Sequence, residues 1–154
     1  MPLIATAALI ISGELADAGL TPFVKTSGSK GLQLYAPLQP TASRTVLEWV
    51  RAFGDRLVEL LPELFVTEIA KAARAGKILV DVNQNLPGRT TVCAYSLRAK
   101  AEPTASTPLT WDEVEAATEG APLTFTSADV LARVERQGDL FEPLLTGRRG
   151  RLTA

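Results

Sequence analysis

The chain is 154 residues long, with 46% hydrophobic residues, 21% charged residues and a formal net charge of −1. These values are typical of one globular domain with a real core, and they exclude a disordered chain and a global basic field for nucleic acid. The chain has no histidine and one cysteine, which excludes histidine general bases, most zinc sites and an internal disulfide framework. We expect that cysteine, Cys93, to be a small core residue, because it lies in a run of alternating apolar residues.

The N-terminal segment is apolar but short. No lysine or arginine precedes Lys25, whereas a signal peptide has a positive N-terminal region and a membrane span needs about 20 apolar residues. We therefore predict a buried helix over residues 4–19, ended by Gly19. The expected location is the cytoplasm, with no membrane partner.

Two predicted strands, residues 22–26 and 32–36, flank a glycine-rich turn. The clearest helix is predicted over 43–61, where Thr45 and Glu48 have the spacing of a capping box. Its apolar residues fall on one face at helical spacing: Val46, Val50, Phe53, Leu57 and Leu61.

The second half of the chain alternates short strands and helices. We predict strands over 64–67, 78–82 and 90–98, a helical turn or loop over 69–77, and a loop over 101–108. Two short helices follow, opened by capping boxes of Thr110 with Glu113 and of Thr126 with Asp129, the second ended by Gly138. The fold class is therefore α/β (α+β), a mixed sheet with helices. The domain covers residues 1–145, and residues 146–154 form a basic tail that frays.

The turn at residues 26–32 reads Thr-Ser-Gly-Ser-Lys-Gly-Leu. Its glycines allow the backbone to approach a ligand closely, and Ser27 and Lys30 place a hydroxyl and an ammonium within four residues. This chemistry is typical of a phosphate-binding turn. A Gly-Ser-rich turn can also be a plain hairpin connection, so this turn alone does not establish a phosphate site.

Two further segments carry polar groups. Asp81 ends an apolar strand, where an unpartnered carboxylate is costly, and Arg74 precedes it in a basic stretch. Arg98 follows Tyr-Ser-Leu and, taken singly, is an ordinary surface cation. Together the three segments offer a carboxylate for Mg²⁺ or Mn²⁺ and cations for phosphates.

In order and spacing these three segments resemble a known family. The run Thr-Ser-Gly-Ser-Lys-Gly-Leu, then Gly-Lys-(apolar)₃-Asp-x-x-Gln-Asn, then Tyr-Ser-Leu-Arg is similar to the polymerase domain of bacterial ligase D. That domain is the primase-polymerase module of non-homologous end joining, in the archaeo-eukaryotic primase superfamily. The resemblance covers about residues 13–143 and implies a nucleotidyltransferase that adds nucleotides to DNA ends with two divalent metals.

The resemblance also implies roles for single residues. Ser27 and Lys30 would bind triphosphate oxygens, and Arg74 would reach the nucleotide or its phosphates. Gln84 and Arg98 would contact the incoming nucleotide. Asp81 would be the catalytic metal ligand for Mg²⁺ or Mn²⁺. The implied partners are nucleoside triphosphate, DNA ends, and a ligase, a Ku-type repair protein or a complementing chain.

The sequence departs from the family pattern in two ways. Gln33 stands where the family has a histidine, and glutamine carries neither a charge nor a transferable proton. The family's Asp-x-Asp motif, which supplies the other two metal ligands, occurs nowhere in the chain. We therefore expect the C-terminal half of a polymerase domain, inactive by itself. It would be a gene remnant, a split-gene product or a repurposed nucleotide- or DNA-phosphate-binding module.

Overall fold

The computed structural model describes residues 1–152, without the side chains of Lys71 and Ala73. The chain divides into two compact units, which we call the hairpin unit and the inserted unit. The hairpin unit comprises Met1–Pro37 and Val92–Arg151, and the inserted unit comprises Leu38–Thr91 with the C-terminal end from Leu152. Residues 153 and 154 of the predicted basic tail lie outside the described residues.

Helix α1 (Pro2–Asp17) opens the hairpin unit and confirms the helix predicted over 4–19. It ends in a Schellman motif, because Gly19 N–H donates to Ala16 O at 2.8 Å and Leu20 N–H donates to Leu15 O at 3.0 Å. Gly19 takes a φ of +76°, which glycine adopts without steric cost. Leu15 and Leu20, the two positions that form the hydrophobic contact of this motif, are both buried.

A three-stranded antiparallel sheet has the order β2-β1-β5. Strands β1 (Phe23–Thr26) and β2 (Leu32–Tyr35) confirm the predicted hairpin. Strand β5 (Pro108–Leu109) pairs with β1 where the sequence predicted the end of a loop. A strand of two residues that begins with proline cannot be recognised from sequence periodicity. Proline is tolerated there because β5 is an edge strand.

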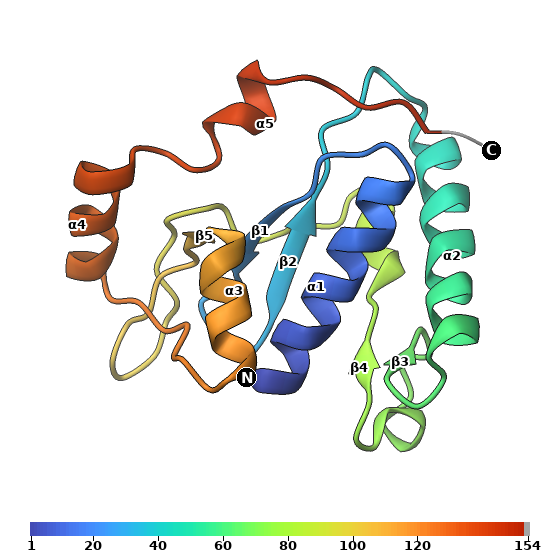
Figure 1. The fold of residues 1–154 in the computed structure, drawn as a ribbon, viewed down its shortest axis with the longest axis horizontal. Helices are drawn as coiled ribbons and strands as arrows, with labels where there is room; N and C mark the ends of the chain where they lie inside the picture. Colours follow the sequence, from blue (N-terminus) through green and yellow to red (C-terminus); the bar gives the residue numbers. More distant parts are fainter. Residues whose placement is uncertain (153–154) are drawn as a thin grey trace. The chain divides into compact units, whose positions relative to one another are not determined.

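Helices α1 and α3 (Trp111–Thr118) pack together on one face of this sheet, as Figure 1 shows. Each helix contributes small, fully buried side chains to the shared core, among them Ala5 and Ala117. The buried cluster takes members from both helices, from both strands of the β1–β5 pair and from the following loop: Ala5, Ala8, Val24, Leu109, Val114, Ala117 and Leu123.

Both predicted capping boxes of the C-terminal helices are present. Thr110 and Glu113 cap α3, and Thr126 and Asp129 cap α4 (Ser127–Gln137), which ends at Gly138 with a φ of +72°. A short helix that the sequence did not predict, α5 (Glu142–Thr146), follows.

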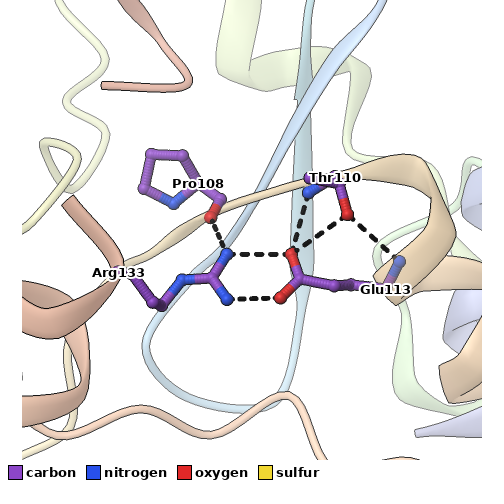
Figure 2. Close-up of polar contacts among 4 residues, drawn as sticks. All are labelled: Pro108, Thr110, Glu113 and Arg133. Carbon is purple, nitrogen blue, oxygen red and sulfur yellow. Dashed lines mark hydrogen bonds and ion pairs between the residues drawn. The ribbon is translucent and has the colours of Figure 1, made fainter. Parts of the chain in front are cut away.

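A paired arginine connects α4 to α3 (Figure 2). Arg133 is buried, and its Nη2 atom donates to Glu113 Oε2 at 2.8 Å and to Pro108 O at 3.1 Å. Its Nη1 atom donates to Glu113 Oε1, so the pair is bidentate. Glu113 therefore has two roles, since it caps α3 and holds the guanidinium that attaches α4.

The inserted unit is built around helix α2 (Ser43–Leu60), which confirms the helix predicted over 43–61. Phe53, Gly54 and Leu57 are buried. A Cβ atom on Gly54 would lie 2.8 Å from Val82 Cγ1, so glycine is required for this close packing. Two short strands, β3 (Phe65–Val66) and β4 (Ile78–Leu79), pair in parallel. The 3₁₀ helices η1 (Lys71–Arg74) and η2 (Val82–Asn85) complete the unit.

Several local predictions were wrong or too long. The helix α2 begins at Ser43 with Ala42 as N-cap, so Thr45 lies inside the first turn and forms no capping box; Glu48 accepts from Arg44 Nε at 2.8 Å instead. Strand β4 ends at Leu79, because the chain turns into η2.

The predicted strand over 90–98 is absent. Tyr95 takes a φ of +69°, which reverses the chain, and only an isolated bridge joins Leu97 to Ala105. Cys93 is exposed and is not a core residue, because the alternation argument assumed a strand that the turn at Tyr95 replaces.

The mixed α/β class is confirmed, with the strands arranged in two small sheets. Within residues 1–152, no helix combines the length and the apolar character that crossing a membrane requires.

Candidate nucleotide-phosphate site

The glycine-rich turn connects β1 to β2 and is held by its own backbone. Ser27 N–H donates to Gly31 O at 2.8 Å, and Ser27 Oγ accepts from the N–H groups of Ser29 and Gly31, both at 3.2 Å. The Ser27 hydroxyl proton is left to donate to a ligand. Lys30 is exposed at the tip of this turn. The turn thus presents one hydroxyl donor and one ammonium, the groups that the sequence predicted for phosphate oxygens.

Arg98 lies beside this turn. Gly28 has a φ of +67°, and a Cβ atom on it would lie 2.7 Å from Arg98 Cγ and 3.0 Å from the backbone of Ala105. Thr104 Oγ1 donates to Gly28 O at 2.6 Å and ties the turn to the same segment. The hairpin unit therefore brings three predicted site residues into one region: Ser27, Lys30 and Arg98.

The segment that carries Arg98 is fixed at both ends. Arg98 N–H donates to Thr104 O at 2.8 Å, and Tyr95 N–H donates to Ser106 O at 2.6 Å. The Tyr95 hydroxyl donates to Asp139 Oδ1, and burial together with this carboxylate raises the pKa of Tyr95 well above its ordinary value. Tyr95 stays a neutral donor at physiological pH and anchors the turn before Arg98.

Sequence reasoning missed a buried lysine below the turn. Lys25 is 1% exposed, and its Nζ atom donates to Gln33 Oε1 and Ser106 Oγ, both at 2.6 Å, and to Val92 O at 2.9 Å. Burial, with a smaller effect from Arg98, lowers the pKa of Lys25 to about 8. The available signal was its position, since Lys25 lies on a mostly buried strand two residues before Ser27.

Lys25 shares its face of the sheet with an aromatic cluster. The alternation of β1 and β2 turns Phe23, Lys25, Gln33 and Tyr35 away from the face covered by α1 and α3. The ring of Phe141 packs edge-on against Tyr35 at 5.5 Å and Phe23 at 6.4 Å between centroids. This second face therefore combines an apolar support with a polar group next to the turn.

The other predicted site residues lie in the inserted unit. Asp81 is the N-cap of η2, and its Oδ2 atom accepts from Gln84 Nε2 at 3.2 Å; both side chains are exposed. Arg74 ends η1, and its Nε atom is buried without a hydrogen-bond partner among the described residues. The structure thus brings Asp81 and Gln84 together. The meeting of Asp81 with Lys30 on one face stays a prediction.

The carboxylates do not by themselves fit a two-metal centre. Among residues 1–152, no group of three histidine, cysteine, aspartate or glutamate side chains is placed to hold a metal ion. Asp81 is a single exposed carboxylate with an amide neighbour. It can offer one or two oxygen ligands to a divalent cation, and the remaining ligands must come from a bound phosphate, water or another chain.

Comparison with known proteins identifies the class of this fold. The structure superposes on the "Polymerase Domain from Mycobacterium tuberculosis Ligase D in complex with DNA" with a TM-score of 0.87 and 40% sequence identity, covering 92% of this chain and 49% of that one. The fold is therefore that of a ligase D polymerase domain.

Sequence comparison agrees. The family model for the LigD primase-polymerase domain matches residues 1–141. The "Multifunctional non-homologous end joining protein LigD" of Mycobacterium bovis is 40% identical over 145 residues, 94% of this chain. The "Bifunctional non-homologous end joining protein LigD" of Bacillus subtilis is 38% identical over 124 residues, 78% of this chain. The chain belongs to the LigD primase-polymerase domain family, which confirms the resemblance. It spans 19% and 20% of the length of these two relatives.

Proposed function

We propose that this chain binds the triphosphate of a nucleoside triphosphate at the glycine-rich turn, as part of a bacterial DNA end-joining system. One observation carries the proposal, the seating of Arg98 against Gly28. The stem of Arg98 lies against the turn that carries Ser27 and Lys30, so the proposed site can include its guanidinium. Charge-assisted bonds from such groups are the strong ones in phosphate recognition.

The functional group of each proposed site residue determines its role. In the hairpin unit, Ser27 donates its hydroxyl while Lys30 and Arg98 neutralise phosphate oxygens. In the inserted unit, Arg74 would reach the nucleotide or its phosphates and Gln84 would contact the incoming nucleotide. Asp81 would hold one Mg²⁺ or Mn²⁺ together with the triphosphate, and such a cation would shield phosphate charge.

DNA ends are the second proposed ligand. The support is homology, since the solved polymerase domain of similar fold is described in complex with DNA. A ligase, a Ku-type repair protein or a complementing chain would then be the protein partner. Work on chromosomal DNA in a bacterium requires the cytoplasm, which stays the predicted location.

A second candidate function is a non-catalytic module that binds nucleotide or DNA phosphate. The observation that favours it is that, among residues 1–152, no group of three histidine, cysteine, aspartate or glutamate side chains is placed to hold a metal ion. Both candidates use the same cations. They differ in whether nucleotide is consumed, so primer extension separates them.

Isothermal titration of the chain with ATP and Mg²⁺ tests the shared binding step. Replacing Lys30 by alanine should weaken binding by about ten-fold, because a charge-assisted bond to phosphate is worth roughly 1.5–3 kcal/mol. Arg51→Ala is the matched control, since it removes one exposed cation from α2 and none from the proposed site. Absence of ATP binding by the unmodified chain, or equal affinities for Lys30→Ala and the control, would refute the proposal.

A further inference from the structure

Lys25 and Gln33 form a cross-strand pair directly below the glycine-rich turn. They are register partners in the β1–β2 hairpin, and Lys25 Nζ lies 2.6 Å from Gln33 Oε1. An ammonium only donates, so the amide atom that faces it must be the carbonyl oxygen. This fixes the orientation of the Gln33 side chain, and its NH₂ group points away from Lys25.

The Lys25 ammonium has an acceptor for each of its three protons, but none of these acceptors carries a negative charge. Its three protons go to an amide oxygen, a serine hydroxyl and a backbone carbonyl, all of them uncharged. Within residues 1–152, no recorded ion pair gives either Lys25 or the neighbouring Arg98 a carboxylate partner. A buried charge without a counter-ion is costly, and a bound anion relieves that cost.

Ser106 links this charge to the turn. Its hydroxyl accepts from Lys25 and donates to Thr26 O at 2.8 Å, the residue before Ser27. The backbone nitrogen of Ser106 also lies close to Gly28, since a Cβ atom on this glycine would fall 3.0 Å from it. A change at Lys25 is thus transmitted to the turn both through the field of its charge and through the two hydrogen bonds of the Ser106 hydroxyl.

We infer that Lys25 is a positioning residue of the anion site: its buried ammonium orients Gln33 so that the Gln33 Nε2 group donates to a phosphate oxygen, and its uncompensated charge draws the anion to the turn. This inference rests on the proposed function. Gln33 then serves as a fixed neutral donor, and the positive charge that it lacks is supplied by the lysine behind it.

The charge of Lys25 gives the inference a distinctive pH dependence. With a pKa of about 8 in the free protein, Lys25 loses its proton where most lysines keep theirs. Anion binding favours the charged form and raises this pKa, so affinity must fall as pH rises through it. The other groups that face Lys25 are Cys93, Arg98 and the ring of Tyr35, 5.8 Å from Nζ.

The experiment measures affinity for inorganic tripolyphosphate at pH 7.5 and pH 9.5. We expect the unmodified chain to bind about ten-fold more weakly at the higher pH. Lys25→Met should bind weakly at both values and lose most of this slope. Cys93→Ser is the control for thiolate charge and should keep the slope of the unmodified chain.

A second measurement needs no variant. Carbon-13 NMR of lysine Cε follows Lys25 in the unmodified chain, and saturating tripolyphosphate should raise its pKa by about one unit. An unchanged pKa, or equal pH slopes for the unmodified chain and a folded Lys25→Met, would overturn the role of Lys25 alone. Failure of tripolyphosphate to bind at any pH would overturn the proposed function as well.

Discussion

The aliphatic stem of Arg98 lies against the backbone of Gly28, so closely that a Cβ atom on Gly28 would fall 2.7 Å from Arg98 Cγ. The glycine is needed twice, for its positive φ and for this contact. The relationship joins the first and third polar segments of the sequence, which are about seventy residues apart. The shape of the glycine-rich turn therefore leaves room for the stem of Arg98.

Gly28→Ala tests this contact. A left-handed conformation costs a non-glycine residue about 1–3 kcal/mol, and the new methyl group must push Arg98 away. We expect a lower melting temperature in circular dichroism and weaker ATP binding in titration. Gly31→Ala is the matched control from the same turn, because its Cβ atom would meet only Ser27 Oγ at an ordinary 3.8 Å. Equal effects of the two substitutions on binding would contradict the assigned role of Gly28.

The pair of Arg133 and Glu113 makes a prediction about acid stability. Burial alone would raise the pKa of Glu113, but the hydrogen bonds from Arg133 and Thr110 outweigh it, and the pKa lies below its ordinary value of 4.5. A folded-state pKa below the unfolded value means that the contribution to stability is present above about pH 4.5 and is lost as pH falls through the folded pKa.

Glu113→Gln should therefore reduce the free energy of unfolding at pH 7 by about 1–3 kcal/mol, because a buried guanidinium loses its charged partner. The deficit should shrink as the pH falls toward 3, where the unmodified chain loses the same interaction. Urea unfolding at pH 7, 5 and 3 measures both effects. Glu115→Gln, on the exposed side of α3, is the control, and a deficit independent of pH would count against the ion pair as its cause.

Local signals in the sequence predicted several elements well. Two of these elements are the capping boxes at Thr110 and Thr126, and a third is the glycine at the end of α1. Each satisfies backbone hydrogen-bonding groups within a few residues, so the short sequence motif alone is enough to predict it. The β1–β2 hairpin is likewise specified by a short turn between apolar runs. Such elements do not depend on what the rest of the chain contributes.

The largest errors came from features that distant parts of the chain decide. Residues 90–98 alternate like a strand, but contacts to Ser106 and Asp139 hold Tyr95 in a left-handed turn. Lys25 was overlooked because its three acceptors come from β2 and from residues near 92 and 106. No spacing rule reveals a lysine whose partners lie 67 and 81 residues away.

The positions of the candidate site residues could be foreseen only in part, for the same reason. Ser27 and Lys30 follow from the turn itself. The approach of Arg98 to the turn requires the glycine at position 28. It also requires the hydrogen bonds that Thr104 and Ser106 form with the segment around Arg98, and these exist only in the folded chain. The pairing of Gln84 with Asp81 is local, because three residues separate them across one turn of η2.

Catalysis is the last prediction, and we expect none from the chain alone. Two-metal phosphoryl transfer needs two cations about 3.5–4 Å apart, held by bridging carboxylates. Among the described residues, no cluster of three acidic, histidine or cysteine side chains could serve, and a single aspartate cannot hold two cations against their mutual repulsion. The triphosphate can chelate one of them, but the cation that activates the primer 3′-hydroxyl would lack an anchor.

Correct positioning of the attacking group is worth about 7–11 kcal/mol, so its loss should abolish turnover rather than slow it. The purified 154-residue chain, incubated with a primed template, nucleotides and Mn²⁺ or Mg²⁺, should give no extended product on a sequencing gel. Activity should appear only when a second polypeptide supplies paired aspartates, and Asp81→Ala should then remove it. Extension by the chain alone that is lost in Asp81→Ala would show that a further metal ligand exists. In that case the binding-module alternative would be excluded, because the chain would consume the nucleotide that it binds.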